Sequence, residues 1–311
     1  MGAQGCGRDA AVTTAPASNA MEQTSTAAFL LSTRGYVRIP NAVPTLTLET
    51  ARTQFFEWLH DCFDTAVEEG VHAVSKRYGV HFWHDKGRFR ISPKLTGAFA
   101  DPMLIAHPQV SAVLSALLGS DFYCKYVGSD TCLGTAALQP PHRDVMFYRV
   151  NSPSCYVINI ALVDCHLDNG PLEVWPNGTQ WWGPQPFLNN RVLPFATEGH
   201  RPELERLLEA CPAEKILLSA GDILLRDPGM LHRGTINRSG EPRPVLTLGV
   251  AKRSYDYRYG NIRFNLDETA YAALDERVRA MFTYAFEPST LFYWRMRWRR
   301  LLAGPAPSRF A

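Results

Sequence analysis

Residues 139–144 read Gln-Pro-Pro-His-Arg-Asp, and residues 221–232 read Gly-Asp-Ile-Leu-Leu-Arg-Asp-Pro-Gly-Met-Leu-His. Alternate side chains of a β-strand face the same side, so His142 and Asp144 present an imidazole and a carboxylate to one point. His232, on a strand far away in the sequence, is the candidate for a third ligand. Two histidines and one carboxylate on one face of an octahedron are the ligands of non-haem Fe(II) oxygenases. The pattern therefore predicts a metal site.

An arginine after the second stretch extends this site. The residues around Ser239 and Gly240 are typical of a turn between two apolar strands. A hairpin centred there places Arg243 opposite Ile236, on the face of the sheet that carries His232. Because a guanidinium grips a carboxylate with two parallel hydrogen bonds, we expect Arg243 to bind a small dicarboxylate that also reaches the metal.

Several motifs follow one another along the chain: residues 35–41 (GYVRIPN), Gln139-x-x-His142-x-Asp144, Ala161-Leu162-x-Asp164, residues 169–179 (NGPLEVWPNGT), Gly221-Asp222, and His232 followed by Arg243. Together they span about residues 27–250 and resemble the phytanoyl-CoA dioxygenase family of Fe(II)/2-oxoglutarate oxygenases. The chain departs from the family pattern at Asn177 to Gln180, where Gly-Ser-His is common after the proline, and at Asn159, near which a tryptophan is common.

The resemblance implies a set of roles for these residues. Iron(II) would be held by His142, Asp144 and His232, and Arg243 would pair with the distal carboxylate of 2-oxoglutarate. Further contacts to this cosubstrate are expected from three residues: Gln139, Asn159 and Gly234. Dioxygen is the third reactant.

The distribution of short strands predicts the fold class. We expect strands over residues 36–39, 122–127, 131–136, 142–147, 156–163, 171–175, 215–218, 222–226, 234–237 and 245–252, and helices over 26–31, 47–71, 102–118 and 268–286. Many short strands between Gly, Pro and Asn favour a mainly β protein with flanking helices, here a double-stranded β-helix of the jelly-roll, cupin-like kind.

The domain organisation follows from the same pattern. We expect a disordered leader over residues 1–26, which are rich in Ala, Thr, Ser and Gly, and a single oxygenase domain over 27–311. Residues 179–213 would form a lid-like insertion, and residues 268–302 the C-terminal helices. The aromatic and arginine-rich end of that segment is expected to dock on its own domain, with a membrane surface or a contact in a homo-oligomer as alternatives.

Composition restricts the partners and the compartment. The formal net charge of +2 gives no reason to expect nucleic acid, and the seven cysteines are scattered without a Cys-x-x-Cys pair. This cysteine usage favours a reducing compartment, and no apolar run is long enough to span a bilayer. We therefore expect a cytoplasmic enzyme with a small-molecule substrate.

The substrate residues are predicted more coarsely. Arg88 and Arg90 are candidates to meet an acidic group, and aromatic residues would line the mouth of the site: Phe147, Tyr148, Trp175 and Trp181. The family resemblance implies oxidation of an unactivated C–H bond, most simply hydroxylation, with release of succinate and CO2, in specialised or natural-product metabolism. Asp144 argues against a halogenase, because related halogenases have Gly or Ala at that position.

An alternative of another class stays open. A fold does not fix a function, so a cupin-like metal-dependent isomerase or a non-catalytic small-molecule-binding protein could carry the same residues.

Overall fold

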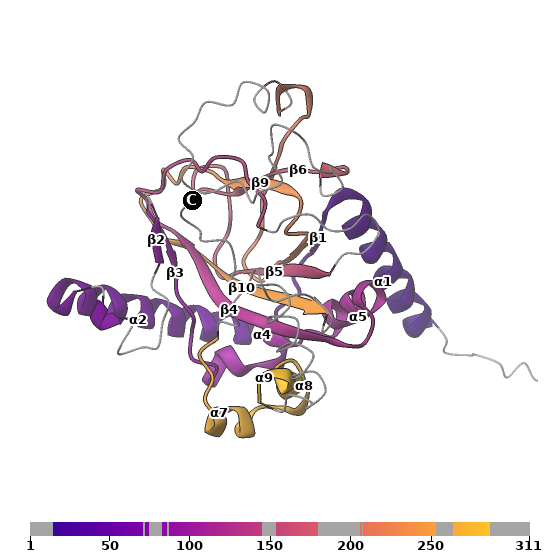
Figure 1. Ribbon diagram of the computed structural model, residues 1–311, viewed down its shortest axis with the longest axis horizontal. Coiled ribbons are helices and arrows are strands. Elements are labelled where there is room, and N and C mark those ends of the chain that lie inside the picture. The colour runs from indigo at the N-terminus through magenta and orange to yellow at the C-terminus, as the bar shows by residue number, and fades with distance from the viewer. Residues whose placement is uncertain are drawn as a thin grey trace, which may run out of the picture.

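The computed structural model describes residues 15–70, 72–74, 83–85, 87–144, 154–179, 206, 208–252 and 264–286 of the chain. Two sheets lie one above the other, and helices cover the outer side of the larger one (Figure 1). Every strand pairing is antiparallel. The described part of the chain is therefore mainly β with flanking helices, as predicted.

The larger sheet brings together strands that are far apart in the sequence. Its order is β1 (Tyr36–Ile39), β8 (Ile223–Arg226), β5 (Cys155–Ala161), β10 (Arg243–Lys252), β4 (Phe122–Cys132), β3 (Arg88–Arg90) and β2 (Trp83–Asp85). The smaller sheet has the order β7 (Glu214–Ile216), β6 (Leu172–Trp175) and β9 (Leu231–Gly234). Ala161 and Val245 of the larger sheet pack against Val174 and Ile216 of the smaller one. Part of the space between the sheets is thus a small apolar core.

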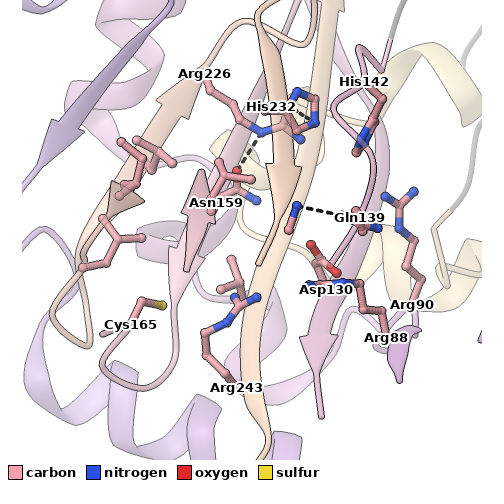
Figure 2. Close-up of a pocket in the computed structure, with 16 residues that line it drawn as sticks. Arg88, Arg90, Asp130, Gln139, His142, Asn159, Cys165, Arg226, His232 and Arg243 are labelled. Atoms are coloured by element: carbon pink, nitrogen blue, oxygen red, sulfur yellow. Dashed lines mark hydrogen bonds between the residues drawn. The ribbon is translucent and has the colours of Figure 1, made fainter. Parts of the chain in front are cut away.

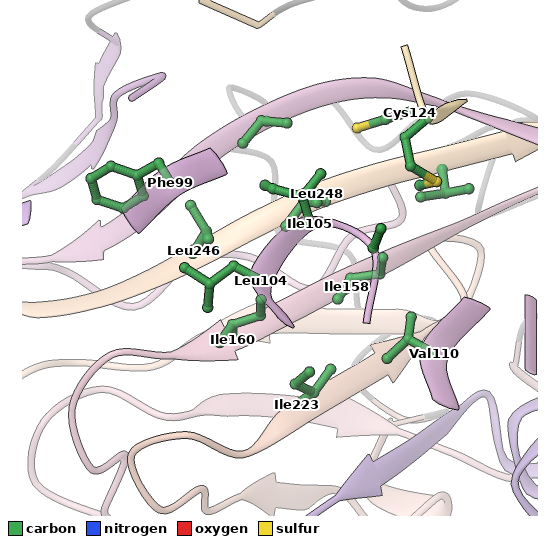
Figure 3. Close-up of a cluster of buried hydrophobic side chains, with 14 of the residues drawn as sticks. Phe99, Leu104, Ile105, Val110, Cys124, Ile158, Ile160, Ile223, Leu246 and Leu248 are labelled. Atoms are coloured by element: carbon green, nitrogen blue, oxygen red, sulfur yellow. The ribbon is translucent and has the colours of Figure 1, made fainter. Parts of the chain in front are cut away.

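The strands of the larger sheet alternate between two environments. Asn159, Arg226 and Arg243 face the smaller sheet and line a pocket between the two (Figure 2). Their sequence neighbours, such as Ile158 and Ile160, face the opposite side and join the main hydrophobic core (Figure 3). This period of two explains how an apolar strand delivers a polar side chain to the pocket.

Helices supply the other half of the main core. They are α1 (Ala15–Arg34), α2 (Thr45–Glu69), η1 (Gly97–Ala100), α4 (Pro102–Ile105), α5 (Pro108–Leu118), α7 (Glu268–Ala273), α8 (Glu276–Ala280) and α9 (Thr283–Phe286). The longest, α2, buries Leu48, Phe55 and Leu59 at helical spacing. None of the helices in the described ranges is both long and apolar enough to cross a membrane.

Several expected boundaries are wrong. Helix α1 begins at Ala15, so the part of the expected leader from there onward is helical, in keeping with the high helix propensity of its alanines. The helix expected over 102–118 is interrupted at Pro108, which cannot continue a helix from the preceding turn. The two strands expected over 122–136 are one strand, β4.

The expected helix over 268–286 is also wrong, because it is three short helices. Asp275 begins a new helix by accepting a hydrogen bond from the backbone N–H of Arg277. Most of the expected lid, and the aromatic and arginine-rich segment near residue 300, lie outside the described residues.

The hairpin expected around Ser239 and Gly240 is wrong as well. Strand β9 pairs with β6 of the smaller sheet, whereas β10 lies between β5 and β4 of the larger one. The side chain of Asn237 donates to the carbonyls of Cys132 and Glu241 at 3.0 and 2.8 Å and accepts from the N–H of Ser239. These bonds carry the chain from one sheet to the other, so the turn crosses between layers.

Candidate metal centre

His142 and His232 are placed opposite each other by the main chain. The N–H of His142 donates to the carbonyl of His232 at 2.8 Å, and the reverse bond measures 3.0 Å. Within the described residues 142–144 this pairing is an isolated bridge, because Asp144 already lies in a bend; the rest of the strand expected over 142–147 lies outside the described residues. The N–H of Asp144 donates to the carbonyl of Pro228, which brings this loop back against the residues before β9.

Both imidazoles have a defined tautomer. The Nδ1 of His142 lies 2.9 Å from the carbonyl of Pro140, and the Nδ1 of His232 lies 2.8 Å from the carbonyl of Met230. A carbonyl only accepts, so each Nδ1 carries a proton, and each Nε2 is the ring nitrogen that is available to a metal. Metal-binding histidines are commonly fixed in this way.

The Nε2 atoms of both rings face a carboxylate. The Nε2 of His142 is 3.8 Å from Oδ1 of Asp144, and the Nε2 of His232 is 3.5 Å from its Oδ2. The ligand atoms of all three residues lie within 4.8 Å of one another. Burial and the nearby His232 lower the pKa of His142 to about 4, so this ring is neutral near pH 7. Two imidazoles and a carboxylate are a donor set that fits Fe(II).

Asp144 is ionised for a specific reason. Burial alone would raise its pKa, but the guanidinium of Arg226 at 2.7 Å and the neighbouring His232 hold the pKa well below its usual range. The carboxylate is therefore a ready metal ligand at neutral pH.

The pocket beside the three ligands holds the predicted cosubstrate residues. It is partly open to solvent and is lined by Gln139, Asn159, Gly234 and Arg243 as well as the two histidines (Figure 2). The N–H of Gly234 donates to Oε1 of Gln139 at 2.9 Å. This bond orients the amide of Gln139, whose Nε2 has no hydrogen-bond partner among the described residues.

Arg243 lies buried at the other end of the pocket. Its guanidinium contacts the thiols of Cys132 and Cys165, and its Nε has no hydrogen-bond partner within the described part of the chain. No carboxylate there forms an ion pair with it. A buried cation without a bound carboxylate is costly, so the site fits a ligand that supplies one.

The predicted substrate residues differ in where they lie relative to the pocket. Arg88 and Arg90 line the pocket, and Arg88 donates to the carbonyl of Thr235. Trp175 does not line it, because Leu172 and Val174 occupy the inward positions of β6 and turn Trp175 to the other face, under the guanidinium of Arg233. Phe147, Tyr148 and Trp181 lie outside the described residues.

Two charged residues that line the pocket were not singled out from the sequence. Arg226 ends the strand Ile-Leu-Leu-Arg, and its inward position could have been found from the alternation with Leu224. Asp130 lies near the arginines of the pocket; burial would raise its pKa, but Arg90 and Arg243 hold the pKa low. No local motif marks Asp130.

The fold and this site define a metal-dependent enzyme of the type that binds a keto-acid cosubstrate. The chain belongs to the phytanoyl-CoA dioxygenase family, whose model matches residues 31–245.

Solved structures with a similar fold have low sequence identity. The non-heme alpha ketoglutarate dependent carbocyclase SnoK from nogalamycin biosynthesis is 16% identical, with a TM-score of 0.55 over 78% of this chain and 88% of its own. The epimerase SnoN, in complex with Fe3+, alpha ketoglutarate and nogalamycin RO, is 17% identical, with a TM-score of 0.53 over 75% of this chain and 85% of its own. HygX from Streptomyces hygroscopicus, with nickel, 2-oxoglutarate and hygromycin B bound, is 12% identical, with a TM-score of 0.50 over 74% and 88%.

Proposed function

We propose that this protein is an Fe(II)/2-oxoglutarate-dependent dioxygenase that oxidises an unactivated C–H bond of a small molecule in natural-product metabolism, most simply by hydroxylation. One observation carries the proposal. The pocket has a His, His, carboxylate cluster at one end and, at the other, a buried Arg243 that forms no direct ion pair with a carboxylate among the described residues. A keto acid with a second carboxylate satisfies both at once.

The chain's own residues would act by binding and orientation. His142, Asp144 and His232 would hold the iron, Arg243 would hold the distal carboxylate of 2-oxoglutarate, and the amide Nε2 of Gln139 would donate to the cosubstrate. The bound iron, with 2-oxoglutarate and dioxygen, would supply the oxidising chemistry that releases succinate and CO2. Burial of both histidines keeps bulk water away from that centre.

The reaction outcome is part of the proposal. Family relationship and fold support an oxygenase-type enzyme, while the similar structures include an epimerase and a carbocyclase. Hydroxylation predicts a product with one added oxygen atom that comes from labelled dioxygen. Cyclisation or epimerisation would leave no such atom in the product, and mass spectrometry of the product distinguishes these outcomes.

The function is tested first without a substrate. The full chain is titrated anaerobically with Fe(II) and 2-oxoglutarate, and the weak visible absorption of the iron–keto-acid chelate is recorded. We expect the band in the wild type and in Arg233→Ala, a control that removes an arginine paired with Glu173 away from the pocket lining. We expect its loss in Arg243→Ala at limiting cosubstrate. Iron binding without the band would instead support the cupin-like alternative, and no metal binding would refute the proposal.

A further inference from the structure

Arg226 contacts two of the three candidate metal ligands, although arginine itself is not a usual metal ligand. Its Nη2 donates to Oδ2 of Asp144 at 2.7 Å, and its Nη1 lies 3.4 Å from Nε2 of His232. The side chain is 9% exposed, so this contact is made away from bulk solvent. A buried guanidinium beside a cation site needs a structural or functional reason, because it repels a bound cation.

A chain of hydrogen bonds fixes the orientation of this guanidinium. The Nε of Arg226 donates to Oδ1 of Asn159 at 3.2 Å (Figure 2). The Nδ2 of Asn159 donates to the hydroxyl of Thr247 at 3.0 Å. The amide cannot be reversed, since an arginine Nε only donates and must meet the amide oxygen. Thr247 in turn donates to the carbonyl of Val245 at 3.5 Å.

The chain runs across neighbouring strands and ends at one oxygen of Asp144. Thr247 on β10 lies opposite Asn159 on β5, and β8 with Arg226 is the next strand. Both polar atoms of the Asn159 amide are used within this chain, which leaves Asn159 less suited to the cosubstrate contact expected from the sequence. Three neighbouring strands thus set the position of the Arg226 guanidinium.

We propose that Arg226 is a positioning residue that holds Oδ2 of Asp144, so that Asp144 binds the metal through one oxygen only, and that Asn159 and Thr247 orient it. This rests on the proposed function. A carboxylate that binds with both oxygens occupies one more coordination position, and the keto acid and dioxygen need every position that the three residues leave open. Arg226 therefore acts on cosubstrate binding through Asp144.

The charge of Arg226 has an effect of its own, which the experiment must separate. Loss of the cation favours metal binding by removing repulsion, and it weakens the binding of an anionic cosubstrate by removing attraction. Metal affinity alone is thus not decisive. Arg226→Lys keeps the charge but cannot donate to Asp144 and Asn159 in a fixed planar fork, so it isolates the positioning effect.

The test uses the full-length Fe(II)-loaded protein under anaerobic conditions. 2-Oxoglutarate is titrated into the wild type, Arg226→Lys, Arg226→Met and the control Arg233→Met, with the chelate absorption as readout. We expect Arg226→Lys to bind 2-oxoglutarate roughly tenfold or more weakly than the wild type, the usual size of an effect from a group behind a ligand. Arg233→Met should match the wild type, although it also breaks an arginine–carboxylate pair.

Two further measurements complete the test. The visible bands of the Co(II)-substituted protein, without keto acid, should differ between Arg226→Lys and the wild type because the coordination number changes. Thr247→Val should also weaken the binding of 2-oxoglutarate, by a smaller factor than Arg226→Lys. Thr247→Ser, which keeps the hydroxyl, should bind 2-oxoglutarate as the wild type does. These two variants allow the positioning role to be tested even if substitution of the buried arginine impairs folding.

The possible failures are distinguishable. If the wild type forms no chelate, the proposed function is wrong and this inference with it. If the wild type forms the chelate and Arg226→Lys binds 2-oxoglutarate with the same affinity and the same Co(II) bands, the oxygenase stands and the positioning role is wrong, whatever Arg226→Met shows.

Discussion

His142 and His232 are a directly opposed pair, joined by two backbone hydrogen bonds with their ring centroids 4.5 Å apart. The spacing of the two imidazoles is therefore set by the main chain, and we expect it to persist when a neighbouring side chain is replaced. Each ring is also fixed by its own carbonyl, so variants at Asp144 test the chemistry of the site rather than the geometry of the histidines.

Replacing Asp144 should abolish metal binding and destabilise the metal-free protein. Asp144→Ala removes a ligand and leaves the guanidinium of Arg226 without its carboxylate, at a cost of about 2 kcal/mol in the free energy of unfolding. Asp144→Ala combined with Arg226→Met should recover part of that stability but none of the metal binding. Urea unfolding and Co(II) titration measure both. Undiminished affinity for Co(II) in Asp144→Ala would contradict the ligand assignment.

Arg243 should recognise the distal carboxylate and nothing else of the cosubstrate. Arg243→Ala should weaken the binding of 2-oxoglutarate by roughly 10- to 100-fold, which is the effect expected from the loss of one or two charge-assisted hydrogen bonds. A keto acid without a second carboxylate should bind the wild type weakly and Arg243→Ala equally weakly. This double cycle uses the chelate absorption of the Fe(II) protein. A loss that is the same for both acids would show that the variant damages the pocket in general.

Gly234 should not tolerate a side chain. A Cβ there would lie 2.4 Å from Cζ of Arg88 and 2.6 Å from Oε1 of Gln139. We expect Gly234→Ala to cost about 1–3 kcal/mol in stability through overpacking and to weaken cosubstrate binding by displacing the Gln139 amide. The matched control is Gly128→Ala on β4, where the nearest atom would be the carbonyl oxygen of Ile91 at 3.4 Å. Equal stability of the two variants in urea would contradict the close packing described here.

His107 should make stability depend on pH. Burial lowers the pKa of its ring, and its Nε2 donates to the carbonyl of Ala42. Below about pH 6.5 the unfolded chain takes up a proton at this residue while the folded protein does not, so the unfolded state binds more protons and stability falls as the pH falls. His107→Gln, which keeps a donor, should lose less stability than the wild type between about pH 6.5 and about pH 5 in urea unfolding. Parallel curves for both proteins would contradict this.

Local patterns correctly predicted a mainly β protein with flanking helices and the cluster of His142, Asp144 and His232. His142 and Asp144 are close in sequence, and the apolar alternation of the central strands is a local property, so both can be read from short stretches. Trp175 was misplaced because the inward and outward faces of a strand differ by one residue, and nothing local shows which face of β6 meets the pocket.

Long-range pairing was harder to predict. Arg243 does reach the pocket, but from a different sheet than the expected hairpin would have placed it in. Arg226 looked like the polar end of a strand, and its role depends on Asp144 and Asn159, which lie far away in the sequence. Such a network appears only when three strands are side by side.

The crossing of the chain between layers has a consequence for cosubstrate choice. His232 stands on the smaller sheet and Arg243 on the larger one, so in the proposed enzyme the keto acid would bridge the gap between two sheets that pack about 10 Å apart. The distance between the sheets would therefore select the chain length of the diacid. Ala161 and Val174, which fill the interlayer core without lining the pocket, would then help to decide whether a diacid one methylene shorter or longer is accepted.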